Sequence, residues 1–256
     1  MRGRSFQVAG VDGCRAGWFV VVASATRQKV LQLNDFCVAK TFADVLSKTT
    51  GCDLVCVDIP IGLSDGAKSR ECDVAARRIL GRSRASSIFP PPIRPCLAAK
   101  EYETASQICF EHSGKKLNRQ SFFIMGKIRE VDLAMTPQLQ QRVCEIHPEL
   151  SFWALAGGKP AKHNKKTLAG RNERIVLLSA IFSDLQQFVT QARQPNKVAP
   201  DDILDAVAAA WTAGQAVIRK AKTLPENPEF DSRGLKMEIL YPARIVHEKT
   251  PRETRG

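Results

Sequence analysis

Three acidic side chains interrupt apolar segments in which a charge is costly. Asp12 follows VAGV, Asp58 follows LVCV, and Glu145 follows the short run RVC. An uncompensated buried charge costs several kcal/mol, and two carboxylates in one crevice repel each other unless a divalent cation lies between them. If Asp12 and Asp58 end neighbouring strands, both enter one crevice at the edge of the sheet. These residues therefore predict a site for a divalent metal ion.

Two more acids lie on a helix that the pattern PDDILDAVAAAWTA predicts at about 201–222. Asp202 and Asp205 are three residues apart, so they share one face of this helix. Asp201 suits the N-cap, and Asp202 suits the positive end of the helix dipole. Asp205 lies past the first turn, among small residues that indicate close packing on a sheet. The face that carries Asp202 and Asp205 can therefore complete a carboxylate cluster.

Three of these acids also have a structural interpretation, which stays open at this point. Asp12 precedes a glycine and can form a turn, Glu145 can be a helix-start acid, and Asp202 can act on the helix dipole alone. His147, between Glu145 and Glu149 in EIHPE, can relay a proton or bind a metal, but it can equally be a local hydrogen-bonding residue.

Hydrophobic periodicity predicts the elements that position these acids. Residues 6–11 and 18–24 form a hairpin, and residues 29–36 alternate as a third strand with one face in water. A short helix at 41–48 then leads to the apolar run LVCVDIP. A helix crossover followed by a wholly apolar strand is typical of a parallel strand buried on both faces.

Residues 60–140 lack strand patterning and predict a helical insertion after the fourth strand. The run SSIFPPPIRP within it must be extended, because each proline fixes its own φ and disfavours the helical region for its predecessor. Beyond it we expect a short strand ending at Glu145, a helix from about Pro148 and a basic loop at 157–174. The other expected elements are three helices in the insertion, two long helices after the basic loop and a short final strand, at 68–80, 99–112, 121–135, 171–192, 201–222 and 237–241.

Composition and charge limit the class of protein. The chain has 256 residues, 44% of them hydrophobic and 25% charged, which is typical of a globular protein and argues against collagen-like, disordered and membrane classes. Its 38 Lys and Arg residues exceed 26 Asp and Glu residues, and the net charge of +12 favours encounters with polyanions such as nucleic acid. A solvated basic surface is the alternative. The candidate phosphate contacts lie in the insertion and the basic loop: Arg77, Arg78, Arg82, Arg84, Arg94, Lys162, Lys165 and Lys166.

The eight cysteines indicate neither a zinc site nor a disulfide framework. None forms a C-x-x-C pair, and Cys52 and Cys56 would lie about 13 Å apart in an extended strand, too far to share one zinc ion. We therefore expect a reducing, cytoplasmic location. The apolar runs near the N-terminus are too short for a signal peptide or a membrane span, so we expect no membrane association.

Several stretches spread over residues 8–213 resemble the DUF429 family, a domain of unknown function predicted to be an RNase H-like nuclease: VAGVDGCRAGW, VDIPIGL, RRILGRSRASSIFPPPIR, CEIHPELSF and DDILDAVAAAWTA. The last stretch also resembles the acid-bearing final helix of RuvC-type junction resolvases. The resemblance implies an RNase H-like α/β fold with a mixed five-stranded sheet, three antiparallel strands first and parallel strands after, and helices on both faces. We expect residues 1–256 to form one such domain, with 60–140 inserted in it.

The resemblance also implies hydrolysis of a phosphodiester bond with two metal ions about 3.5 to 4 Å apart, one activating water and the other stabilising the leaving oxygen. Asp12 would bridge both ions, with Asp58 and Asp205 each binding one. Asp202 and Glu145 would be secondary ligands. Hard oxygen ligands favour Mg²⁺ or Mn²⁺ over zinc. Nucleic acid is then the expected partner, and the basic residues would contact its phosphates.

Three other functions fit parts of the sequence. A phosphotransferase of the actin and sugar-kinase type opens with a similar strand, hairpin and strand, but it normally repeats the hairpin in a second lobe, for which this chain is short. A dinucleotide enzyme fits less well, because GVDGCRAG departs from G-x-G-x-x-G and puts an acid where pyrophosphate would lie. A non-catalytic nucleic-acid-binding or scaffold protein of the same fold would need the basic charge but no turnover.

Overall fold

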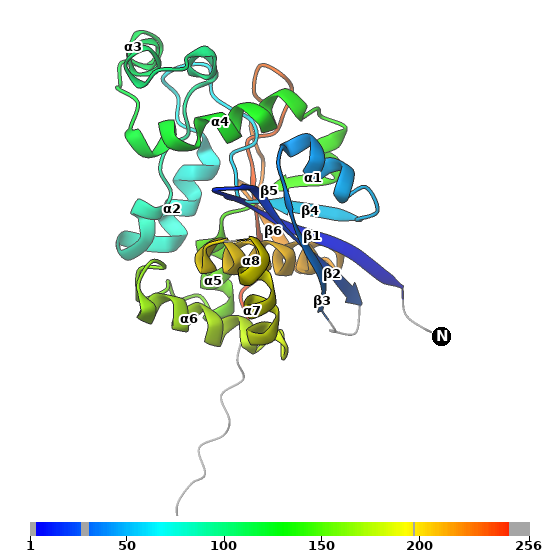
Figure 1. The fold of residues 1–256 in the computed structure, drawn as a ribbon. Helices are drawn as coiled ribbons and strands as arrows, with labels where there is room; N and C mark the ends of the chain where they lie inside the picture. Colours follow the sequence, from blue (N-terminus) through cyan, green and yellow to red (C-terminus); the bar gives the residue numbers. More distant parts are fainter. Residues whose placement is uncertain (1–3, 27–30, 197, 246–256) are drawn as a thin grey trace, which may run out of the picture.

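The computed structural model of this protein describes residues 4–26, 31–196 and 198–245. Its centre is a mixed five-stranded sheet with strand order β3-β2-β1-β4-β5 (Figure 1). The first three strands pair in antiparallel fashion, whereas β4 is parallel to β1 and β5 is parallel to β4. The predicted fold class is therefore confirmed. From β1 to β5 the strands span Ser5–Cys14, Gly17–Thr26, Gln32–Ala39, Leu54–Val57 and Val143–Glu145.

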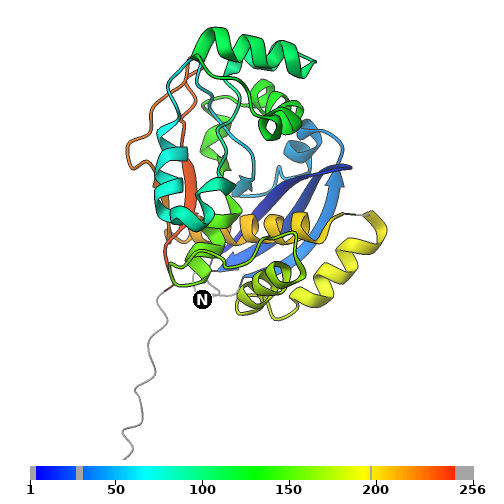
Figure 2. The same cartoon turned by 90° about the vertical axis from the view of Figure 1, so that its left-hand side faces the viewer.

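Helices cover both faces of this sheet, as Figures 1 and 2 show. They span Phe42–Lys48 (α1), Arg119–Ala134 (α4), Pro148–Leu155 (α5), Leu168–Ser179 (α6), Leu185–Asn196 (α7) and Pro200–Val217 (α8). On one face, Val8 of β1 and Cys56 of β4 belong to a core with α8. On the other face, Val11 and Val57 belong to a core with α1 and α4. Successive residues of a strand point to opposite faces, so each strand contributes to both cores.

Two glycines determine how closely other elements approach β1 and β2. Gly10 of β1 faces α8, and a Cβ atom there would lie 2.1 Å from the backbone oxygen of Ala206. Gly17 begins β2 with a φ of +135°, and a Cβ atom there would lie 2.2 Å from the backbone oxygen of Ala39. Glycine permits these backbone approaches, which a larger residue would prevent. Helix α8 therefore lies directly against the central strand.

Between β4 and β5 the described chain is helical or irregular and contains no strand. Helix α2 (Glu71–Arg84) is kinked at Gly81, whose φ of 63° and ψ of −177° are not helical. Helix α3 spans Tyr102–Ser113, and α4 follows it. The three helices expected here are thus present with shifted ends. The run SSIFPPPIRP is extended at Ile88 and Ile93, but its two ends lie in 3-10 helices at Ala85–Ser87 and Arg94–Ala98, so the expectation of a wholly extended run is wrong there.

Two predictions for the chain after α5 are wrong. The helix expected at 171–192 is two helices, α6 and α7, because the chain leaves the helix between them and buries Phe182 in the core. The basic loop expected at 157–174 ends at Thr167, whose hydroxyl accepts the N–H of Gly170 and caps α6. The loop is therefore shorter than the basic composition indicated.

The ends of two other elements also differ from the prediction. Helix α8 ends at Val217, and its N-cap is Ala199 rather than Asp201, because Pro200 takes the first helical position with its fixed φ. The final strand, expected at 237–241, is β7 (Ile239–Pro242), which begins two residues later. It pairs in antiparallel fashion with β6 (Ala221–Leu224).

The third strand also begins later than expected, and the expected residues 29 and 30 lie outside the described part of the chain. Among the described helices, none combines the length and the apolar character needed to cross a bilayer.

Candidate metal centre

Three carboxylates meet at the C-terminal ends of β1 and β4. Asp12 lies near the end of β1, Asp58 directly follows β4, and Asp205 lies in α8. One ligand oxygen of each lies within 4.8 Å of those of the other two, so the three residues can hold a metal ion. Asp12 and Asp205 are buried, with 8% and 1% of their surface exposed, and Asp58 is half-buried. We call these three residues the acidic triad.

Strand register and one glycine explain why the acidic triad forms. β1 and β4 are neighbours, and the Asp58 N–H donates to the Val11 carbonyl at 2.9 Å, which places Asp58 beside Asp12. Asp12 is two residues beyond Gly10, on the face that α8 covers. The close contact of α8 with Gly10 then brings Asp205 over the ends of both strands.

The acidic triad carries more negative charge than its surroundings neutralise. Burial, and then the charges of Asp58 and Asp205, raise the pKa of Asp12 well above its usual value of 3.8. Burial raises the pKa of Asp58 to about 7, against the opposing effect of Lys165. Burial and the neighbouring acids raise the pKa of Asp202 to about 7. Asp12, Asp58 and Asp202 thus share one region in which their charged forms are disfavoured.

Lys165 is the cation that contacts the acidic triad. Its Nζ donates to Oδ2 of Asp205 at 2.5 Å, and the charge of Asp205 raises the pKa of Lys165, so the ammonium stays charged. The other oxygen of Asp205, Oδ1, is buried and has no hydrogen-bond partner among the described residues. An unpartnered buried oxygen carries an uncompensated desolvation cost. The oxygen donors and this deficit of positive charge fit a hard divalent cation.

Asp202 lies beside the acidic triad, one helical turn before Asp205 on α8. Its carboxylate is not among the three whose oxygens lie within 4.8 Å of one another. It lines the same cleft as the three acids of the triad, and its charge contributes to the raised pKa of Asp12. This residue is therefore placed to add an oxygen to the site without belonging to its centre.

Glu145 lines the same cleft as the acidic triad, but its side chain leaves β5 on the opposite face of the sheet from Asp58. It is in register with Val57, which belongs to the core of α1 and α4, so it does not share the face of Asp58. Arg70 donates to both oxygens of Glu145, at 2.7 and 2.8 Å, and also pairs with Asp73. The expected role of Glu145 as a secondary metal ligand is therefore not supported, because a guanidinium engages both of its oxygens.

The acidic triad opens into a cleft of about 690 Å³, which we call the metal cleft. Basic side chains from three segments line it: Arg84 of α2, Lys127 of α4, and Lys165 and Lys166 of the loop before α6. A phosphate group beside the triad would therefore meet positive charge. Lys127 was not predicted, because a single lysine in a helical pattern carries no signal of a site.

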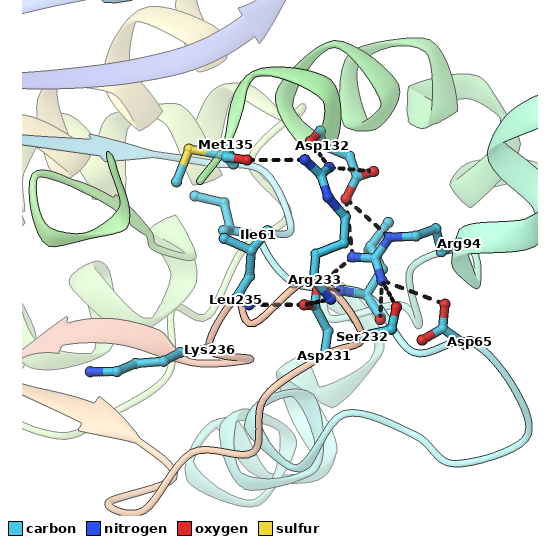
Figure 3. A network of polar contacts seen from close by, with 12 residues as sticks. Ile61, Asp65, Arg94, Asp132, Met135, Asp231, Ser232, Arg233, Leu235 and Lys236 are labelled. Carbon is cyan, nitrogen blue, oxygen red and sulfur yellow. Dashed lines mark hydrogen bonds and ion pairs between the residues drawn. The ribbon is translucent and has the colours of Figure 1, made fainter. Parts of the chain in front are cut away.

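The other predicted phosphate contacts lie elsewhere. Arg77 lines a second, adjacent cleft. Arg94 is engaged by Asp132 and Asp231 in a network of ion pairs (Figure 3), so its guanidinium is already occupied and the expected phosphate contact is not supported. Three further residues are exposed and do not line the metal cleft: Arg78, Arg82 and Lys162.

His147 and Glu149 also line the metal cleft. Nδ1 of His147 accepts the Glu149 N–H at 3.3 Å and caps α5, while Nε2 lies 3.3 Å from the Ser87 carbonyl oxygen. Burial lowers the pKa of His147, which favours the neutral ring. Glu149 pairs with the buried Arg174. These contacts give both residues local structural partners.

Fold and site together define the class of this protein. It is an α/β protein with the mixed sheet expected of an RNase H-like fold and an acidic triad that can hold a metal ion at the strand ends. Residues 10–230 match the family described as "Protein of unknown function (DUF429)", and the chain belongs to that family. The resemblance to the DUF429 family that the sequence indicated is thus confirmed. No curated protein and no solved structure matches the chain.

Proposed function

We propose that this protein is a metal-dependent hydrolase that cuts phosphodiester bonds in nucleic acid. The observation that carries the proposal is the acidic triad, three carboxylates with oxygens within 4.8 Å of one another in a cleft that lysine and arginine also line. Carboxylates that repel each other in a buried place cost stability, and the nearby cations do not balance them. A divalent ion would remove this repulsion.

The donor set supports particular ions and roles. Hard carboxylate oxygens favour Mg²⁺ or Mn²⁺ over zinc. Asp12, Asp58 and Asp205 would hold these ions through their carboxylate oxygens. Asp202 would add a further oxygen. When bound, such ions activate water and stabilise the leaving oxygen of a phosphodiester.

Charge supports a polyanionic substrate. The chain has a net charge of +12, and Arg84, Lys127 and Lys166 line the metal cleft near the acids. Charge-assisted hydrogen bonds from such groups bind phosphate oxygens. The eight cysteines form no disulfide, which supports a reducing, cytoplasmic location for this activity.

One contact favours a second candidate, a non-catalytic nucleic-acid-binding protein of the same fold. The Lys165 ammonium already pairs with Asp205, and it supplies part of the charge that a metal ion would otherwise supply. In such a protein the basic cleft would bind nucleic acid, and the acids would be held by Lys165 alone. Cleavage and metal binding separate the two candidates.

A cleavage assay tests the proposal. With Mn²⁺, the wild type should cut at least one of labelled single-stranded and duplex DNA and RNA. Asp12→Asn should lower the rate by roughly 10³-fold or more, because a carboxylate that would hold the metal supports several kcal/mol of transition-state stabilisation. Asp35→Asn removes an exposed carboxylate of β3 and is the matched control, which should leave the rate unchanged. Equal cleavage by the wild type and Asp12→Asn would indicate a contaminating nuclease, and binding without cleavage would favour the second candidate.

A further inference from the structure

A second cleft of about 650 Å³ adjoins the metal cleft. It lies among α2, the proline-rich run after it and the connection from α3 to α4. The two clefts share a wall, because five residues line both of them: Arg70, Asp73, Ser86, Ile88 and Phe89. A ligand long enough to pass this wall can therefore occupy both clefts at once.

The second cleft combines an apolar lining with positive charge. Phe89 and Leu117 line it together with the prolines of the run PPP. Lys115 and Lys116 also line it, both are exposed, and neither forms an ion pair with a carboxylate of the described residues. Its volume is in the range typical of small-ligand sites. An aromatic or apolar group with an attached anion fits this chemistry.

Hydrogen bonds hold the cleft walls in place. The carbonyl of Ile88 accepts a bond from Nε of Arg77 at 2.7 Å, and the carbonyl of Pro90 accepts one from the Ser121 hydroxyl at 2.6 Å. On the opposite side, the Tyr102 hydroxyl donates to the carbonyl of Leu117 at 2.8 Å. Prolines fix the backbone between these bonds. The cleft is therefore formed before a ligand binds, which lowers the entropy cost of binding.

We propose that the second cleft binds a nucleobase and its flanking phosphate in a single-stranded nucleic acid whose neighbouring phosphodiester lies in the metal cleft. The inference rests on the proposed function for the position of that phosphodiester. Phe89 would stack with the base, while Lys115 and Lys116 bind the phosphates. A duplex keeps its bases stacked and paired, so it cannot present one to Phe89. The substrate class is therefore single-stranded DNA or RNA.

Fluorescence anisotropy with a labelled single strand, in EDTA so that no cleavage occurs, tests this site. The double variant Lys115→Ala with Lys116→Ala should weaken binding, and the slope of log K against log salt should become shallower by about 1.4, or about 0.7 for each lost phosphate contact. The double variant Lys220→Ala with Lys222→Ala removes the same charge from exposed residues that line neither cleft. This control should keep the wild-type slope.

A second variant tests stacking without removing charge. Phe89→Leu keeps an apolar side chain in the wall but loses the aromatic face, and it should weaken single-strand binding about fivefold or more. Binding to a duplex of the same sequence should change little. Circular dichroism of the variant checks that the fold is retained.

Three outcomes would overturn the inference: equal slopes for the two lysine double variants, unchanged single-strand binding by Phe89→Leu, or a free mononucleotide that binds as tightly as the strand. The result is separable from that of the cleavage assay. Asp12→Asn should still bind the single strand in EDTA if the second cleft is the base site, whether or not the wild type cuts.

Discussion

Two groups of acidic residues in this molecule have opposite surroundings. In the acidic triad, Lys165 is the cation in contact, and one oxygen of Asp205 has no partner among the described residues. In the second group, Arg94 and Arg233 hold Asp132 and Asp231 between α4 and the loop that precedes β7 (Figure 3). We call the second group the arginine network.

The pKa shifts of the two groups differ in the same way. Burial acts to raise the pKa of Asp231, but hydrogen bonds from Arg94 and from three backbone N–H groups outweigh it, and the pKa is lowered. Burial raises the pKa of Asp12, and the neighbouring acids Asp58 and Asp205 add to the effect. Burial is thus common to both sites, and the number of hydrogen-bond donors around each carboxylate decides whether its pKa is raised or lowered. A carboxylate surrounded by guanidinium and N–H groups stabilises the fold, whereas one surrounded by other carboxylates destabilises it unless a cation binds.

Removal of Asp231 should give the largest change in stability. Its side chain is fully buried, and Asp231→Ala removes one of the two carboxylates that pair with Arg94 and leaves three backbone N–H groups without their acceptor, so the free energy of unfolding should fall by about 4 kcal/mol. Chemical denaturation measures this loss. Asp65→Ala is the control, because Asp65 lies at the exposed end of the network, 3.5 Å from Arg94, with 48% of its side chain exposed. Equal losses in the two variants would contradict the comparison.

Metal should stabilise the protein through the acidic triad and not through the arginine network. Mn²⁺ at 100 times its dissociation constant should raise the free energy of unfolding of the wild type by about 2.7 kcal/mol, because it binds the folded state. EDTA should reverse the gain. Asp205→Asn should lose it, whereas Asp65→Ala should keep it. Stabilisation of the Asp205→Asn variant by Mn²⁺ would place the ion elsewhere.

The sequence allowed the sheet, and two of the three residues of the acidic triad, to be predicted from periodicity. Asp12 and Asp58 end apolar strands, and an acid at such a position is visible without a structure. Asp205 could be predicted for another reason, because the small residues around it indicated a helix packed on the sheet. In each case the signal lies within a few residues of the acid itself.

Glu145 and Arg70 show why other parts of the site could not be predicted. β5 has only three residues, too few for a pattern that tells one face of the sheet from the other, so the sequence did not show that Glu145 pairs with Arg70. Arg70 is 75 positions away from Glu145 in the chain, and nothing near Arg70 in the sequence marks it as buried. Phe182 likewise divides the helix expected at 171–192 through a core contact that local propensity does not contain.

The raised pKa values give the metal-free protein a characteristic pH dependence. A carboxyl group whose folded pKa lies above its unfolded value binds more protons in the folded state, so stability falls as the pH rises from about 4 to about 7. For Asp58, whose pKa is raised to about 7, the loss between pH 5 and 7.5 should be about 2 to 3 kcal/mol. Denaturation curves of the wild type and Asp58→Asn in EDTA measure it. Parallel pH profiles would contradict the assigned shift.

The smallest predicted effect concerns Lys165, whose ammonium is the one in contact with the acidic triad among the residues that the structure describes. Lys165 and a metal ion compete for Asp205, so Lys165→Met should tighten Mn²⁺ binding about tenfold in isothermal titration calorimetry. Lys166→Met is the matched control, because Lys166 lines the same cleft but forms no ion pair with the triad, and its effect should be smaller. Weaker binding in Lys165→Met would mean that the ammonium orients Asp205 for the ion rather than competing with it, and the charge deficit that separates the triad from the arginine network would then be overstated.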